Sequence, residues 1–117
     1  MRVAGFGFRK SASLASLQAA LALAGGKVDA LATVEDKVSG LTALAQDMGL
    51  PLIAVTRAAL AAQPRAGSSK VQDLYQTGSV AESSALAAAG PGATLVASRV
   101  TSPDGMAVAA IAEGPRS

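Results

Sequence analysis

The sequence predicts an α/β fold, a three-layer αβα domain with a mixed, mainly parallel sheet and a C-terminal β-hairpin. Two observations lead to this prediction. Short apolar runs typical of strands alternate with runs of helical periodicity, which favours parallel strands joined by helices. The last two strand-like runs flank Pro103-Asp104-Gly105, which favours a turn and an antiparallel pair. Half of the 117 residues are hydrophobic, enough for one core, so we expect one domain over 1–117 with 112–117 as a loose tail.

The first strand is expected over residues 3–8, where an apolar run ends in a loop that contains glycine. A helix follows, because leucine recurs at helical spacing from Leu14 to Leu21 until the pair Gly25-Gly26 stops it. Residues 28–34 form the second predicted strand, which has β-branched residues near its ends and leads into a charged loop.

A second helix is expected to have Ser39 as its N-cap, because a serine side chain accepts the free amide groups of a first turn. Apolar residues from Leu41 to Met48 share one face of this helix, and Gly49 ends it. Residues 51–55 form the third predicted strand. Each predicted strand so far is followed by a helix or a charged loop, as parallel strands require.

Thr56 can cap a short helix that ends near Gln63, and the composition of residues 64–69 favours a mobile surface loop. The last helix has the strongest start signal in the chain, since Ser79 and Glu82 have the spacing of a capping box. Gly90 ends that helix. Two strands at 94–100 and 106–112 then form the predicted hairpin.

The composition excludes several kinds of chemistry. The chain has no histidine and no cysteine, so it cannot form a Ser-His-Asp triad, a Cys-His pair, a structural zinc site or an axial histidine bond to haem or corrin. We expect no metal and no cofactor. A net charge of +2 with three aromatic residues argues against a nucleic-acid partner. No apolar run approaches the roughly 18 residues of a membrane span, and no signal peptide is evident, so we expect a cytoplasmic protein without a membrane partner.

The first candidate site lies where the first predicted strand ends. Gly5 and Gly7 let the backbone approach a ligand, the helix beyond offers free amide groups to an anion, and Arg9 and Lys10 add positive charge. The dinucleotide-binding fingerprint is incomplete, because Lys10 occupies a position that needs glycine. The alternative is that both glycines only allow tight packing of a helix on the strand.

A second group of polar residues follows the second strand. Thr33, Glu35 and Lys37 should lie at the same edge of the sheet as Gly7 and Arg9. Lysine beside two acids is most often a solvated surface cluster, and the functional alternative makes Lys37 an anion clamp. Glu35 is also a candidate general acid or base if it is desolvated.

A third group surrounds the start of the last helix. The capping box accounts for Ser79 and Glu82 without a ligand, whereas Gly78 and the exposed amide groups could form an anion-binding nest. Glu82 is the second candidate acid or base. Arg99 interrupts an apolar run that we expect to be a central strand, where a lone arginine needs a partner or a ligand. Either Ser98 or Arg99 should face away from its neighbours.

Several segments, taken in order, resemble a cobalamin-biosynthesis family that comprises CobE-type proteins and the C-terminal domain of CbiG. The segments are Gly5-Phe6-Gly7-Phe8-Arg9, Thr33-Val34-Glu35-Asp36-Lys37, Gly49-Leu50-Pro51-Leu52, Ser69-Lys70-Val71 and Gly78-Ser79-Val80-Ala81-Glu82-Ser83-Ser84-Ala85-Leu86. The resemblance extends from Val3 to Ile111, and its force comes from the order and spacing of the segments. Two positions depart from the family pattern: Phe8, where a small residue or cysteine is frequent nearby, and Arg99, where lysine is common.

The resemblance implies a tetrapyrrole ligand of the precorrin or hydrogenobyrinic acid type, whose rim carries many carboxylates, and a role as carrier or chaperone. It also leaves two alternatives open: a hydrolase that opens a ring-A lactone with release of acetaldehyde, and an interaction module for another enzyme of the pathway. The residues expected to bind the ligand are Gly5, Gly7, Phe8, Arg9, Thr33, Glu35, Lys37, Gly78, Ser79, Val80, Glu82 and Arg99.

Overall fold

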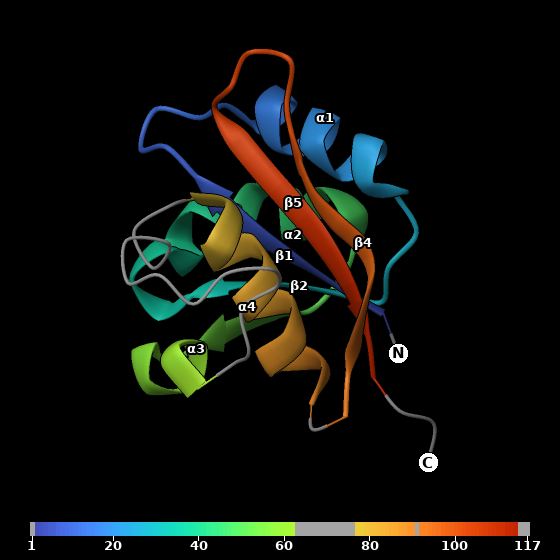
Figure 1. Cartoon of the computed structure of the whole chain (residues 1–117). Helices are drawn as coiled ribbons and strands as arrows, with labels where there is room; N and C mark the ends of the chain where they lie inside the picture. The colour runs from blue at the N-terminus through green and yellow to red at the C-terminus, as the bar shows by residue number, and fades with distance from the viewer. Residues whose placement is uncertain (1, 63–76, 91, 115–117) are drawn as a thin grey trace.

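A computed structural model describes residues 2–62, 77–90 and 92–114, which form a five-stranded sheet with strand order β3-β2-β1-β5-β4 (Figure 1). The strands are β1 (Arg2–Phe8), β2 (Ala30–Val34), β3 (Leu52–Val55), β4 (Thr94–Thr101) and β5 (Ala107–Glu113). Pairing is parallel between β1 and β2 and between β2 and β3, and it is antiparallel between β1 and β5 and between β5 and β4. The mixed sheet and the C-terminal hairpin are as predicted.

Helices cover both faces of this sheet, which confirms the three-layer prediction. They are α1 (Leu14–Ala24), the 3₁₀ helix η1 (Glu35–Leu41), α2 (Thr42–Met48), α3 (Arg57–Ala62) and α4 (Thr77–Ala89). The core beneath α1 and α2 contains Phe6 and Leu44, whereas Val3 and Ala32 belong to the core on the face of α3 and α4. Figure 1 shows α4 lying across β1 on the side of the sheet opposite α2.

Two caps form as the sequence predicts. Thr56 accepts a hydrogen bond from the amide of Ala59 at 3.1 Å and so caps α3. Gly49 ends α2 in the left-handed conformation, with φ 67°, which glycine adopts without the steric cost that a side chain would bring. None of the helices within the described residues is long and apolar enough to cross a membrane.

The prediction that Ser39 caps the second helix is wrong. The chain turns directly from β2 into η1, so Ser39 lies inside this 3₁₀ helix and α2 begins at Thr42. Leu41 takes the N-cap position and makes no side-chain cap. A tight 3₁₀ turn satisfies backbone groups within itself, so α2 continues from it without a serine cap.

Two further boundaries differ from the prediction. Helix α4 begins at Thr77, so Ser79 lies within its first turn and not at the N-cap. Strand β5 continues to Glu113, where it pairs with Arg2, so the expected tail does not begin at residue 112. The predicted loop at 64–69 lies outside the described residues.

Arg99 lies on an edge strand, so the prediction of a central strand is wrong. Among the described residues, strand β4 pairs only with β5, and its register shifts twice, once between Leu95 and Ala97 and again between Ala97 and Val100. Such bulges break the alternation of side chains. Ser98 and Arg99 are therefore both exposed, and neither turns inward as a regular strand would require.

Candidate functional site

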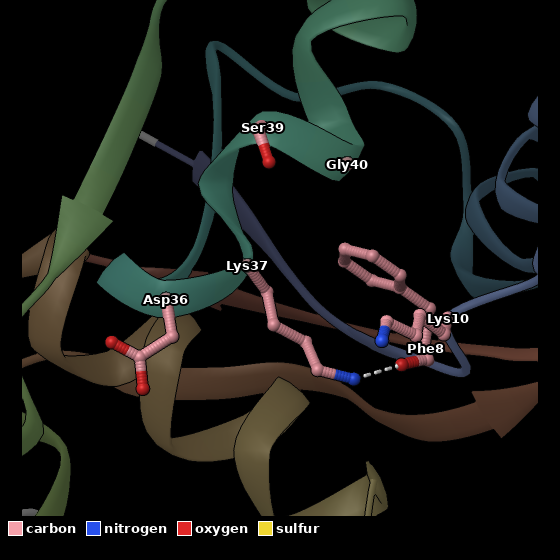
Figure 2. Close-up of a pocket in the computed structure, with 6 residues that line it drawn as sticks. All are labelled: Phe8, Lys10, Asp36, Lys37, Ser39 and Gly40. Carbon is pink, nitrogen blue, oxygen red and sulfur yellow. Dashed lines mark hydrogen bonds between the residues drawn. The ribbon is translucent and has the colours of Figure 1, made fainter.

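The carboxyl ends of β1, β2 and β3 lie at one edge of the sheet because these strands are parallel. Loops at this edge are the usual ligand sites of open α/β sheets. A pocket of about 340 Å³ lies here between the segment that follows β1 and helix η1. Its lining residues, drawn in Figure 2, are Phe8, Lys10, Asp36, Lys37, Ser39 and Gly40.

Lys37 reaches across the pocket to the end of β1. Its Nζ donates a hydrogen bond to the Phe8 carbonyl oxygen at 2.5 Å and lies 5.2 Å from the centroid of the Phe8 ring (Figure 2). Both the carbonyl oxygen and the face of the ring attract a cation. Because η1 begins immediately after β2, the parallel pairing of β1 and β2 places Lys37 beside Phe8. The ammonium group is thus held at a defined point.

Gly40 makes room for the Phe8 ring. A Cβ atom at position 40 would lie 2.5 Å from Cε2 and 2.7 Å from Cζ of Phe8, closer than such atoms can approach without a shift. Phe8 is 7% exposed and packs in the same core as Leu41. The pocket therefore combines a mostly buried aromatic ring with charged side chains, the usual mixture in small-molecule sites.

The acidic residues beside Lys37 are turned toward α3. Asp36 forms an ion pair with the Arg57 guanidinium, and the Glu35 carboxylate accepts a hydrogen bond from the Arg57 amide at 3.2 Å. Figure 2 shows the Asp36 carboxylate pointing away from the Lys37 ammonium group. Within the ranges that the structure describes, neither Lys10 nor Lys37 forms an ion pair. The pocket thus presents two positive charges that no carboxylate of these residues neutralises.

Two of the predicted site residues have structural roles. Gly5 lies under α4, and a Cβ there would lie 2.1 Å from the Ala81 carbonyl oxygen, so this glycine allows close packing of helix on strand. Thr33 is fully buried and its hydroxyl donates to the Phe6 carbonyl oxygen at 2.8 Å. Gly7 is also buried, within the β1–β5 ladder.

Arg9 and the predicted residues of α4 belong to the same region but do not line the pocket. Arg9 is exposed next to Phe8. Gly78, Ser79 and Val80 occupy the first turn of α4, whose following residues pack on β1. The antiparallel run of α4 over β1 places this turn toward the carboxyl end of the strand.

The two candidate acid or base residues both accept backbone hydrogen bonds. Glu35 is exposed and accepts from the Arg57 amide, as described above. Glu82 is only 9% exposed, and its carboxylate accepts from the amide of Arg99 at 3.3 Å. The donor is the main-chain amide of Arg99, so the exposed guanidinium group of Arg99 takes no part in this hydrogen bond. Both carboxylates thus connect neighbouring elements of the fold.

Asp36, Ser39 and Gly40 line the pocket, although they are not among the ligand-binding residues expected from the sequence. A usable signal was present, because polar residues and a glycine directly follow the second strand at an edge where ligands bind. Lys10 lines the pocket as well, and the sequence indicates it only as a nearby positive charge. Three acidic side chains that could hold a metal ion do not come together anywhere in the described parts of the chain.

A separate polar cluster joins the β4–β5 hairpin to the start of α1. Asp104 accepts hydrogen bonds from the hydroxyls of Ser102 and Ser16 and from the amide of Met106. These donors, Ser102 first and then Ser16, hold the pKa of Asp104 below its ordinary value, because they favour the charged carboxylate. The cluster explains how the hairpin turn is held against the helix.

The chain belongs to the cobalamin synthesis G C-terminus family, whose model matches residues 2–112. This family membership places it in cobalamin biosynthesis and confirms the resemblance seen in the sequence. A search of curated proteins found no match.

Solved structures agree with this assignment. The cobalamin biosynthesis protein chiG from Agrobacterium tumefaciens strain C58 is 35% identical, with a TM-score of 0.74, and the match covers 99% of this chain and 100% of that one. CobE, a protein from the cobalamin (vitamin B12) biosynthetic pathway, is 33% identical with a TM-score of 0.73, covering 96% and 89% of the two chains. A cobalamin biosynthesis protein G homolog from Sulfolobus solfataricus is 14% identical, with a TM-score of 0.75 over 99% of this chain and 37% of that one; this match shows the shared fold.

Proposed function

We propose that this protein binds a tetrapyrrole intermediate of the precorrin or hydrogenobyrinic acid type and acts as its carrier or chaperone in cobalamin biosynthesis. The observation that supports the proposal is the pocket at the carboxyl edge of the sheet, where the Phe8 ring lies beside the ammonium groups of Lys10 and Lys37. Such a ligand has an apolar ring system and a rim of carboxylates. Both parts find a suitable partner in this pocket.

The size of the pocket indicates how much of the ligand enters it. About 340 Å³ is near the lower end of the range for small-molecule sites, roughly 300–1,000 Å³. One side of a macrocycle fits this volume, and the remainder would lie over the neighbouring surface. A partly exposed ligand suits a carrier, because a second protein can then take hold of the open side.

The chain also limits how a corrinoid could be held. It contains no histidine and no cysteine, so it supplies neither an imidazole nor a thiolate to a cobalt ion. The carboxylate rim is therefore the part of the ligand for which this chain has charged partners.

The proposal can be tested by titrating the purified protein with hydrogenobyrinic acid while the absorbance spectrum of the tetrapyrrole is recorded. We expect a saturable spectral change at one ligand per chain, and mass spectrometry should recover the ligand unaltered. A spectrum that does not change at micromolar protein would contradict the proposal. Release of acetaldehyde from a lactone-bearing intermediate would instead favour the hydrolase.

A further inference from the structure

We propose that Lys10 and Lys37 form a two-point receptor for two ionised carboxylates of the ligand. The inference rests on the proposed function and adds a substrate class: the ligand must carry free acid side chains at the edge that enters the pocket. Lys10 comes from the segment after β1 and Lys37 from η1, so the receptor joins the two sides of the pocket. Figure 2 shows both lysines beside Phe8.

Lys37 is the positioned half of the receptor. An ammonium group has three donors, and the hydrogen bond to the Phe8 carbonyl oxygen uses one of them. The remaining donors are free for a ligand while this bond keeps Nζ in place. A group that is already positioned loses less conformational entropy on binding, so it contributes more of its interaction to affinity.

Lys10 supplies the second charge. It is exposed, and Asp36, the acidic residue among the described residues that line the pocket, is engaged by Arg57. Asp36 therefore leaves the charge of both lysines available to a ligand. Two ammonium groups that line the same pocket also repel each other, and a pair of carboxylates would remove that repulsion.

This arrangement should distinguish an ionised carboxylate from a neutral group of similar shape. An amide oxygen can still accept a hydrogen bond from a lysine, but a charge-assisted bond to a carboxylate is about twice as strong. A ligand with its side chains amidated keeps the ring system and the hydrogen-bonding oxygens and loses only the charge. Selectivity for the free acid is thus the signature of the two-lysine receptor.

The experiment compares hydrogenobyrinic acid with the derivative in which its side-chain carboxylates are amides, using the wild-type protein and charge-removing variants. We expect Lys10→Gln and Lys37→Gln each to weaken binding of the acid about fivefold, as for exposed ion pairs of about 1 kcal/mol. For the wild-type protein, the amide derivative should bind about twenty-fivefold more weakly than the acid, the combined loss of two such pairs. Lys27→Gln is the matched control, because Lys27 is exposed between α1 and β2, at the opposite edge of the sheet.

The outcomes separate this inference from the proposed function. Equal binding of acid and amide by the wild-type protein would overturn the receptor and leave tetrapyrrole binding intact. Binding of neither compound would overturn both. Since Lys37→Gln also removes the bond to Phe8, Lys37→Arg is a second variant, and it should keep part of the preference for the acid because it keeps the charge.

Discussion

The two faces of the sheet are packed in different ways. Toward α4, β1 presents Val3 and Gly5, and the helix lies so close that its Ala81 carbonyl oxygen occupies the space of a Gly5 side chain. Toward α1 and α2, the same strand presents Phe6 and Phe8, whose rings fill the core on this face. One glycine brings a helix onto the strand, and another, Gly40, leaves room for a ring. Close contact of main-chain atoms thus characterises the face of α4, whereas on the other face the Phe8 ring reaches the pocket.

The largest loss of stability should come from Gly5→Ala, which would disrupt the close packing of α4 on β1. The added methyl group meets main-chain atoms of α4, with the Ala81 carbonyl oxygen at 2.1 Å and the Ala85 amide nitrogen at 2.5 Å, and neither can rotate away. We expect the free energy of unfolding to fall by about 3 kcal/mol, at the upper end of typical overpacking costs. Chemical denaturation followed by circular dichroism measures this change.

Gly49→Ala is the control for that experiment. A Cβ at position 49 meets nothing within 4 Å, but the residue has φ 67°, so the variant should lose about 1 kcal/mol from backbone strain alone. Equal losses at the two glycines would contradict the importance of close packing at Gly5.

A smaller effect on stability is expected for Gly40→Ala, which tests the face of the sheet where the Phe8 ring lies. Here the new methyl group meets the edge of the Phe8 ring, which can tilt into the pocket, so unfolding should become easier by about 1 kcal/mol. The tilted ring would occupy ligand space and weaken tetrapyrrole binding in the absorbance titration. Ser98→Ala, at an exposed position of β4 that does not line the pocket, should leave stability and affinity close to wild type. A Gly40→Ala protein that binds as tightly as wild type would refute the role of the ring.

The smallest effect on stability is expected for Asp104→Ala, which removes the carboxylate that connects the β4–β5 hairpin to α1. The size of this effect depends on pH. Hydrogen bonds from Ser102 and Ser16 lower the pKa of Asp104 in the folded protein. Its contribution to stability is therefore complete above the ordinary value of 3.8 and is lost as the pH falls through the lower, folded pKa. The difference in melting temperature between wild type and Asp104→Ala should shrink only under such acid conditions. A difference that shrinks near pH 6 would contradict this account, and Asp47→Ala, another exposed aspartate, serves as control.

Much of the fold could be predicted from the sequence because its signals are local. Leucine spacing and Gly25 define α1, Thr56 caps α3, and the turn at Asp104 forms the hairpin. Helix starts were harder to predict. Ser39 has the chemistry of a cap, yet a 3₁₀ turn beginning at Glu35 enclosed it, and only the path of the chain after β2 decides between the two.

The structure brings Phe8 and Lys37 of the predicted site together in one pocket, and it places other predicted residues, such as Gly5 and Arg99, outside that pocket. Phe8 and Lys37 lie together because β1 and β2 pair in parallel. Such a parallel pairing can be predicted from the sequence pattern. Whether a glycine faces a ligand or a helix depends on which side of β1 it occupies, so Gly5 could not be assigned without the structure. The edge position of β4 and its register shifts, which expose Arg99, follow from pairing between distant segments.

The register shifts of β4 matter for how copies of this protein behave toward one another. A sheet that ends in a regular strand offers a row of free amide and carbonyl groups to any other strand, and such rows promote aggregation. In β4 the row is interrupted twice, and the Arg99 amide is directed to Glu82. Strand β4 contains neither lysine nor proline, the residues that often protect an edge. The irregular backbone thus makes β4 a poor template for pairing with a strand of a second copy.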